Sequence, residues 1–162
     1  MPKTNTMYSM KDIKIIRTDT LNLKVKELIK ALDKELRGYY GDIQDSYTPH
    51  NDVSKGFPTI LIEQAGKPIG CGAFKPYDKT SAELKRVFLK KEARGKGLSK
   101  LMVKALEDWM LERNLSIARL ETGGKQLEAL GLYQKLGYKV IPKYGVYVDM
   151  PNSICMKKDL LI

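Results

Sequence analysis

A basic, glycine-containing segment in the middle of the chain could bind a phosphate group. Residues 94–99 read Arg-Gly-Lys-Gly-Leu-Ser, and they follow an apolar run, residues 87–89, that is typical of a buried strand. From Leu98 onward apolar residues recur at helical spacing, so a helix begins within the segment. A helix N-terminus carries unpaired N–H groups and a partial positive charge, to which Arg94, Lys96 and Lys100 add their cations. The pattern therefore predicts an anion site suited to a phosphate or pyrophosphate.

The spacing of this segment separates it from two common nucleotide-binding turns. It lacks the Gly-Lys-Ser/Thr end of the Walker pattern, and a dinucleotide fingerprint needs a third glycine where Lys100 stands. The order Arg94, Gly97 and the small Ser99 instead resembles the coenzyme A pyrophosphate loop of the GCN5-related N-acetyltransferase (GNAT) family. That family usually has Gly or Ala at the last position, so Ser99 is a departure. The alternative is a glycine-rich turn that only joins a strand to a helix.

A second segment strengthens the resemblance. Residues 129–138 read Ala-Leu-Gly-Leu-Tyr-Gln-Lys-Leu-Gly-Tyr. This is similar to the late motif of the same family, in which a helix carrying Leu-Tyr is followed by a Gly and by an aromatic residue that starts the next strand. The two segments occur in the expected order and on the expected elements, and the likeness covers roughly residues 60–157.

The resemblance implies both a fold and a co-substrate. It implies an α/β fold with a mixed, mostly antiparallel central sheet, helices on both faces, and a V-shaped splay between two parallel strands, residues 82–89 and 117–121. It also implies acetyl-CoA, with the pantetheine arm between those strands and the pyrophosphate on the glycine loop. The coenzyme-binding residues that follow from the resemblance are Val87, Phe88, Leu89, Arg94, Gly95, Lys96, Gly97, Leu98, Ser99, Gln126 and Tyr133. Gln126 stands where many relatives have Asn, which is a second departure.

Acetyl transfer from a thioester to an amine sets the requirements for catalytic groups. The amine must lose a proton, the developing oxyanion needs hydrogen-bond donors, and the departing thiolate needs a proton. Glu83 is the first candidate base, because strand alternation places it on the same side as Val87, and Glu121 is the second. Either could instead be an ion-paired surface residue. Tyr133 is the candidate acid, since a phenol keeps its proton at pH 7, although it could also be a core aromatic.

Periodicity and turn residues predict the elements that position these groups. A two-residue hairpin at Ala65-Gly66 is expected to join two strands, and Gly70 and Gly72 leave one face of the second strand almost bare, so that something can pack closely on it. The expected strands are residues 13–16, 58–64, 67–74, 82–89, 117–121, 138–141 and 153–157, and the expected helices are 21–36, 98–113 and 125–136. The first helix is predicted to end at Gly38.

Length, composition and charge bound the organisation of the chain. With 162 residues, 43% of them hydrophobic, we expect a single acetyltransferase domain over residues 1–162 with a flexible start at residues 1–11. No apolar run approaches the ~18 residues of a membrane span, and the start of the chain does not resemble a signal peptide, which predicts a cytoplasmic protein without a membrane partner. Cys71, Cys155 and His50 lack metal-ligand spacing, so no metal is expected and both thiols are predicted to be reduced.

The acceptor is the least constrained part of the prediction. Two tyrosine-containing loops favour a compact pocket for a small-molecule amine, with Tyr39, Tyr144 and Tyr147 as candidate substrate-binding residues. The net charge of +10 argues against a cationic acceptor unless nearby carboxylates make the pocket negative. A protein N-terminus or lysine is the enzymatic alternative, and a basic RNA- or ribosome-binding module is the non-enzymatic one. Nucleic acid is disfavoured because the aromatic residues lie in predicted loops and helices. A homodimer is left open.

Overall fold

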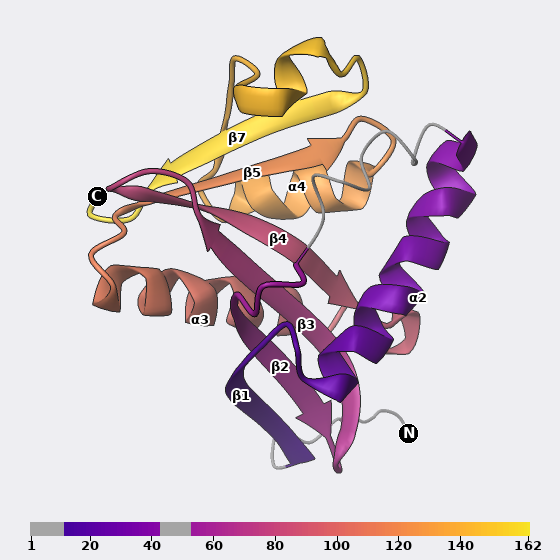
Figure 1. Cartoon of the computed structure of the whole chain (residues 1–162). Helices are drawn as coiled ribbons and strands as arrows, with labels where there is room; N and C mark the ends of the chain where they lie inside the picture. Colours follow the sequence, from indigo (N-terminus) through magenta and orange to yellow (C-terminus); the bar gives the residue numbers. More distant parts are fainter. Residues whose placement is uncertain (1–11, 43–52) are drawn as a thin grey trace.

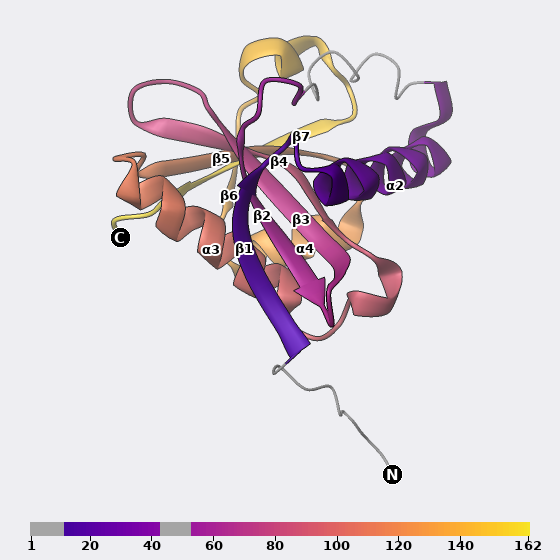
Figure 2. The same ribbon diagram turned by 60° about the horizontal axis from the view of Figure 1, so that its bottom comes forward.

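The computed structural model describes residues 12–42 and 53–162, which form one seven-stranded sheet with helices on both faces (Figures 1 and 2). The strand order is β1-β2-β3-β4-β5-β7-β6, and every neighbouring pair is antiparallel except β4 and β5. The strands are β1 (Ile13–Asp19), β2 (Pro58–Gln64), β3 (Lys67–Pro76), β4 (Ser81–Leu89), β5 (Ile117–Gly123), β6 (Lys139–Ile141) and β7 (Ser153–Asp159). The helices are α2 (Leu23–Tyr40), α3 (Leu98–Glu112) and α4 (Leu127–Lys135), with short 3₁₀ turns η4 (Lys91–Ala93) and η5 (Gly145–Asp149).

The two faces of the sheet have separate apolar cores. α3 and the sheet enclose the larger one, in which Met102, Leu106 and Met110 of α3 are completely buried. α2 covers the opposite face with the stripe Val25, Leu28, Leu32, Leu36 and Tyr40. This arrangement confirms the predicted mixed α/β architecture with helices on both faces.

Helix α2 is longer than predicted. Its N-cap Asn22 accepts hydrogen bonds from the backbone N–H groups of Lys24 and Val25, as the polar residues before the helix suggest. The predicted end at Gly38 is wrong, because the helix continues to Tyr40 and the left-handed φ of +56° occurs at Gly41. Burying Tyr40 below Leu36 extends the apolar stripe by one turn and outweighs the low helix propensity of Gly38. Tyr47 and His50 lie outside the described residues.

The prediction of close packing on β3 is confirmed. The hairpin turn Ala65-Gly66 joins β2 to β3, and both residues have positive φ. A Cβ atom on Gly70 would lie 2.4 Å from Leu89 Cδ2, and one on Gly72 would lie 3.0 Å from Leu106 Cδ1. Side chains of β4 and α3 therefore occupy the space that larger residues on β3 would fill.

Strands β4 and β5 separate along their length. Their parallel register runs only from Ser81 opposite Ile117 to Glu83 opposite Arg119. Beyond Glu83 the two strands have no further paired residues, although β4 continues to Leu89 and β5 to Gly123. This is the V-shaped splay that the resemblance predicted.

A bulge in β4 overturns the predicted alternation of its side chains. Arg86 has a φ of +56°, and the register between β3 and β4 shifts at this point. Val87 consequently packs in the same core as Leu84 and Leu89, whereas Phe88 packs beneath α2 and Arg86 forms a salt bridge with Asp33 of α2. The prediction that Glu83 and Val87 share a side is therefore wrong, because one extra residue reverses the facing of everything beyond it.

Candidate active site

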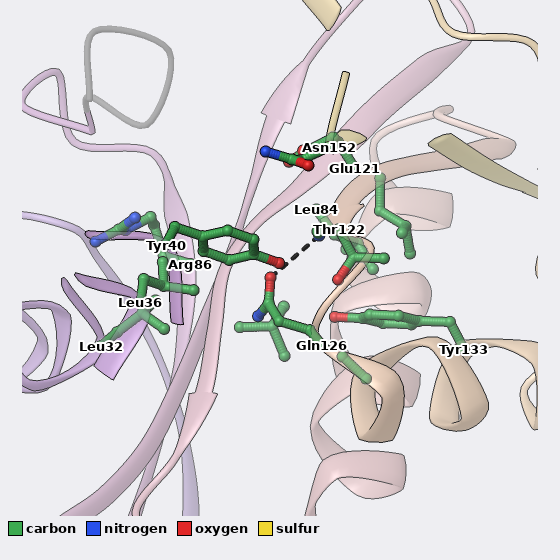
Figure 3. A pocket seen from close by; sticks show the side chains of 14 residues that line it. Leu32, Leu36, Tyr40, Leu84, Arg86, Glu121, Thr122, Gln126, Tyr133 and Asn152 are labelled. Carbon is green, nitrogen blue, oxygen red and sulfur yellow. Dashed lines mark hydrogen bonds between the residues drawn. The ribbon is translucent and has the colours of Figure 1, made fainter. Parts of the chain in front are cut away.

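A cavity opens where β4 and β5 separate, and we call it the splay cavity (Figure 3). Its volume is ≈ 110 Å³, and its walls come from both strands, from α2 and from α4. A larger cavity of ≈ 500 Å³ adjoins it and extends to the glycine loop. The two share the wall residues Leu32, Val87, Gln126, Ala129 and Tyr133. The two cavities together run from the N-terminus of α3 to the interior of the splay.

The larger cavity collects almost all of the predicted coenzyme-binding residues. Those that line it are Val87, Phe88, Leu89, Arg94, Gly95, Gly97, Leu98, Ser99, Gln126 and Tyr133. Lys96, which is exposed, is the predicted residue that does not line it. Lys100, whose cation was expected at the anion site, also lines this cavity. Lys125, for which no role was predicted, lines it too, and both add positive charge.

The glycine loop has the geometry of an anion site. Gly95 and Gly97 have φ values of +77° and +81°, which side chains rarely adopt, and a Cβ on either would meet nothing within 4 Å. Gly97 is the N-cap of α3 and has no side chain to cap the first turn, whose N–H groups lack acceptors within the helix. Leu98 is buried and anchors the start of the helix. These N–H groups can donate hydrogen bonds to the oxygens of a phosphate.

Arg94 occupies the loop in an unexpected way. Its guanidinium donates hydrogen bonds to both carboxylate oxygens of Glu35 in α2, at 2.9 and 3.0 Å, and to the carbonyl oxygen of Leu89 at 2.9 Å. The cation also lies 5.7 Å from the centre of the Phe88 ring. Much of its positive charge is therefore compensated within the protein, and the side chain ties the loop to α2.

Tyr133 and Gln126 place polar groups in the cavity from α4. Tyr133 packs edge-on against Tyr138, with ring centres 5.6 Å apart, and its hydroxyl points into the cavity (Figure 3). Burial raises the pKa of the Tyr133 phenol, so the group keeps its proton at neutral pH. Gln126 Oε1 accepts a hydrogen bond from the backbone N–H of Gly123 at 3.1 Å, which fixes the turn between β5 and α4.

Glu83 lies in a closed polar network. The Lys85 ammonium is 3.2 Å from its carboxylate, and the Tyr144 hydroxyl donates a hydrogen bond to it at 2.8 Å. Lys85 also donates to the Tyr147 hydroxyl at 2.7 Å. Burial and the Glu83 charge raise the pKa of both phenols, so Tyr144 and Tyr147 stay neutral. The network holds η5 against β4.

Glu121 has different surroundings. It lines the splay cavity, and Ser153 Oγ donates a hydrogen bond to its carboxylate at 2.7 Å. No salt bridge among the described residues includes Glu121. Burial raises its pKa, and the Ser153 hydrogen bond and the charge of Lys85 lower it by less. Of the two candidate bases, Glu121 is the one that lines the cavity.

The predicted substrate-binding tyrosines are not all in one place. Tyr144 and Tyr147 pack edge-on with ring centres 5.6 Å apart, and Tyr147 is buried at 3% exposure. Tyr39 is exposed and lines the larger cavity beside Lys125. Its neighbour Tyr40, which lines the splay cavity, was not among the predicted site residues. The continuation of the α2 apolar stripe at four-residue spacing from Leu36 was the signal that could have identified Tyr40.

The thiols are unsuited to nucleophilic catalysis. Cys71 and Cys155 are free and buried. Burial raises the pKa of Cys71 to about 12 and also raises that of Cys155, so neither forms a thiolate readily.

In the described part of the chain no group of three or more His, Cys, Asp or Glu is placed to hold a metal ion. None of the described helices is both long and apolar enough to cross a membrane.

Known proteins share this sequence pattern and fold. Residues 25–138 match the Acetyltransferase (GNAT) family. An "IAA acetyltransferase" of Azospirillum brasilense is 30% identical over 157 residues, which cover 93% of this chain and all of that protein. A Klebsiella pneumoniae structure described as an acyl-CoA N-acyltransferase superposes with a TM-score of 0.77 at 27% identity, covering 91% of this chain and 97% of that one. An Elizabethkingia anophelis GNAT acetyltransferase with acetyl-CoA bound gives 0.67 at 17% identity, covering 92% and 99%. The chain therefore belongs to the GNAT family and is an N-acetyltransferase.

Proposed function

We propose that this chain uses acetyl-CoA to acetylate the primary amine of a small molecule by direct transfer. One observation carries the proposal. The cavity that opens where β4 and β5 part contains both a carboxylate, Glu121, and a phenol, Tyr133, and it adjoins the cavity that reaches the glycine loop. A base, an acid and an anion site are thus arranged along one continuous path.

The coenzyme end of the path fits a diphosphate. The first-turn N–H groups of α3, together with Lys100 and Lys125, supply donors and positive charge, and Gly95 and Gly97 leave room for close approach. The splayed half of β4, Val87 to Leu89, has no partner in β5 and so can offer backbone groups to a pantetheine arm. A β4 N–H at this point is our candidate donor to the acetyl oxygen.

The reaction end of the path assigns one task to each polar group. Glu121 accepts a proton from the ammonium of the acceptor, directly or through one water, because a primary amine is mostly protonated at pH 7, and the neutral amine then attacks the acetyl carbon. Its raised pKa makes it a stronger base than an ordinary carboxylate. Tyr133, which keeps its proton, donates that proton to the sulfur as the C–S bond breaks. Acetyl-CoA supplies the acyl group as a thioester, and the products are the amide and the free thiol.

Two features support a small acceptor. The splay cavity is small, at ≈ 110 Å³, and η5 is fixed over the neighbouring sheet by Tyr144 bonded to Glu83 and by Lys85 bonded to Tyr147. A compact, rigid wall suits a small molecule better than an extended peptide. Glu121 gives the cavity a negative group that can attract an ammonium despite the overall positive charge of the chain.

A panel of primary amines tests the proposal. Free thiol released from acetyl-CoA is followed with small amines, with an N-terminal peptide and with a lysine peptide, and acetyl-CoA binding is measured by calorimetry. We expect binding of acetyl-CoA and turnover with at least one small amine. Turnover with a peptide alone would move the assignment to a protein acetyltransferase, and thermal stabilisation by RNA but not by acetyl-CoA would overturn it.

A further inference from the structure

Tyr40 bridges two sides of the splay cavity. It is the last residue of α2, and its side chain extends from that helix toward the turn between β5 and α4 (Figure 3). The ring is buried at 8% exposure and lines the cavity. The phenol lies so close to the end of β5 that a Cβ on Gly123 would be 1.7 Å from the Tyr40 hydroxyl oxygen.

The contacts around Tyr40 hold it in this position. Its hydroxyl accepts a hydrogen bond from the backbone N–H of Lys125 at 3.3 Å. The Lys125 ammonium lies 5.8 Å from the centre of the Tyr40 ring and donates a hydrogen bond to the carbonyl oxygen of Tyr39 at 3.4 Å. Gly123 leaves the space that the phenol needs, because any side chain there would displace it. The end of α2 is thus fastened to the turn by both polar and packing contacts.

The proposed chemistry makes such closure necessary. A carboxylate that can take a proton from an amine can also take one from water. The water oxygen would then attack the acetyl carbonyl carbon, the C–S bond would break, and acetate and free thiol would form without any amide. Excluding bulk water from the reacting carbon prevents this side reaction.

We propose, resting on the function proposed above, that Tyr40 is a positioning residue that closes the acyl end of the splay cavity and so directs the acetyl group to the amine rather than to water. Its ring supplies the barrier, and its hydrogen bond to Lys125 keeps the ring in place. Gly123 is the second part of this arrangement, because the absence of a side chain there leaves room for the phenol.

Variants at both positions separate this role from a purely structural one. Tyr40→Ala removes the barrier, and Tyr40→Phe keeps the ring while losing the hydrogen bond to Lys125. Gly123→Ala leaves the Tyr40 side chain intact but displaces it from its position beside the turn. Gly123 has a negative φ, so alanine fits the backbone there. The double variant Tyr40→Ala/Gly123→Ala tests whether the Gly123 effect acts through Tyr40. Gly38→Ala, on the same helix and with nothing within 4 Å of the new Cβ, is the matched control.

The measurement is thiol release from acetyl-CoA with no amine present, together with the Kd for acetyl-CoA and the melting temperature of each variant. We expect hydrolysis to rise about tenfold in Tyr40→Ala and in Gly123→Ala, and to rise less in Tyr40→Phe, which keeps the ring but loses its hydrogen bond, while Gly38→Ala stays near the wild type. In the double variant Gly123→Ala should add nothing. A Cβ on Gly123 would also lie 3.1 Å from Gln126 Oε1, so an equal effect of Gly123→Ala with and without Tyr40 would assign the effect to Gln126 and overturn the proposal.

The outcomes distinguish this inference from the function on which it rests. If the wild-type chain does not bind acetyl-CoA, the proposed function fails and the role of Tyr40 fails with it. If acetyl-CoA binds equally well to the wild type and to folded Tyr40→Ala while hydrolysis is unchanged, only the role of Tyr40 is overturned. Should Tyr40→Ala fail to fold, Gly123→Ala carries the same test with the Tyr40 side chain intact, and unchanged hydrolysis there overturns the role equally.

Discussion

Exchanging each candidate base for its amide should give opposite results at Glu121 and Glu83. Glu121→Gln keeps the shape of the side chain and an oxygen that can accept the hydrogen bond from Ser153, but it cannot take a proton. General-base catalysis contributes typically 10²–10⁴-fold, so kcat/KM should fall by about that factor while acetyl-CoA binding is retained. Thiol release with the best amine of the panel, measured beside calorimetry, gives both quantities.

The stability of Glu121→Gln follows from the direction of its pKa shift. Burial raises the pKa of Glu121, so the folded protein binds that proton more tightly than the unfolded chain does. The resulting stabilisation is fully present below the unfolded pKa of ~4.3 and is lost as the pH rises through the folded pKa. Glutamine never ionises, so the variant should be at least as stable as the wild type at pH 7, with the difference disappearing in acid. Urea unfolding at both pH values measures this.

Glu83→Gln should damage the fold instead. Lys85 is only 7% exposed, and its ammonium lies 3.2 Å from the carboxylate that would be neutralised. Breaking a buried pair costs about 3–5 kcal/mol, and the lower value applies here because the amide oxygen can still accept hydrogen bonds. A loss of ~3 kcal/mol lowers the melting temperature by roughly 6–12 °C in a chain of this size. Glu27→Gln, on the exposed face of α2, is the control.

A reversed pattern would refute this reasoning. If Glu83→Gln abolished turnover with no loss of stability, and Glu121→Gln remained active, then Glu83 would be the base and its contact with Lys85 would tune it. Loss of both activity and acetyl-CoA binding in Glu121→Gln would show that the residue shapes the coenzyme cavity rather than accepting a proton.

Three further predictions concern the acid, the glycine loop and the pH dependence. Tyr133→Phe should lower kcat by about 10²-fold or more with little change in acetyl-CoA affinity, and unchanged turnover in single-turnover assays would remove Tyr133 from the mechanism. Gly97→Val places a β-branched residue at a φ of +81° at the N-cap of α3, so acetyl-CoA affinity should fall by about tenfold or more in calorimetry, whereas Gly131→Ala, with open space around its Cβ, should bind normally. In a plot of kcat/KM against pH, the pKa of the acid limb should lie above ~4.3, the pKa of an ordinary glutamate, because burial raises the pKa of Glu121. This limb should be absent in Glu121→Gln.

Elements with strong local signals were predicted closely from the sequence. Strand β2 was predicted over its full span, because Pro58 begins it and the Ala65-Gly66 turn ends it. Helix α3 was within one residue, since its apolar spacing is regular and Gly97 precedes it. The end of α2 was not predicted, because Gly38 is a local stop signal that the burial of Tyr40 overrides. A prediction from local helix propensity fails where tertiary packing contributes more free energy than the propensity costs.

The parts of the site that depend on the backbone of a few adjacent residues could be predicted from the sequence. The parts that depend on contacts between side chains far apart in the sequence could not. The glycine loop follows from a few adjacent residues, and the structure gathers nearly all of the residues expected beside it. The pairing of Glu83 with Tyr144 joins residues 61 positions apart, and that of Arg94 with Glu35 joins residues 59 apart. No local pattern indicates such contacts, so the ranking of Glu83 before Glu121 depended on strand alternation alone.

The bulge at Arg86 explains how one strand can serve both ends of the proposed reaction. With strict alternation, the residues facing α3 would be every second one, and Val87 would point the same way as Glu83 and Lys85. The extra residue instead keeps Lys85 and Arg86 on the face opposite α3, where they meet Tyr147 and Asp33, and returns Val87 to the face of Leu84. Charged groups therefore lie on the side where η5 and α2 cover the sheet, and an apolar residue lines the cavity that leads to the glycine loop. The positive φ of a non-glycine residue has a cost, and the bulge that contains Arg86 lies in the half of β4 that no longer pairs with β5, because that pairing ends at Glu83.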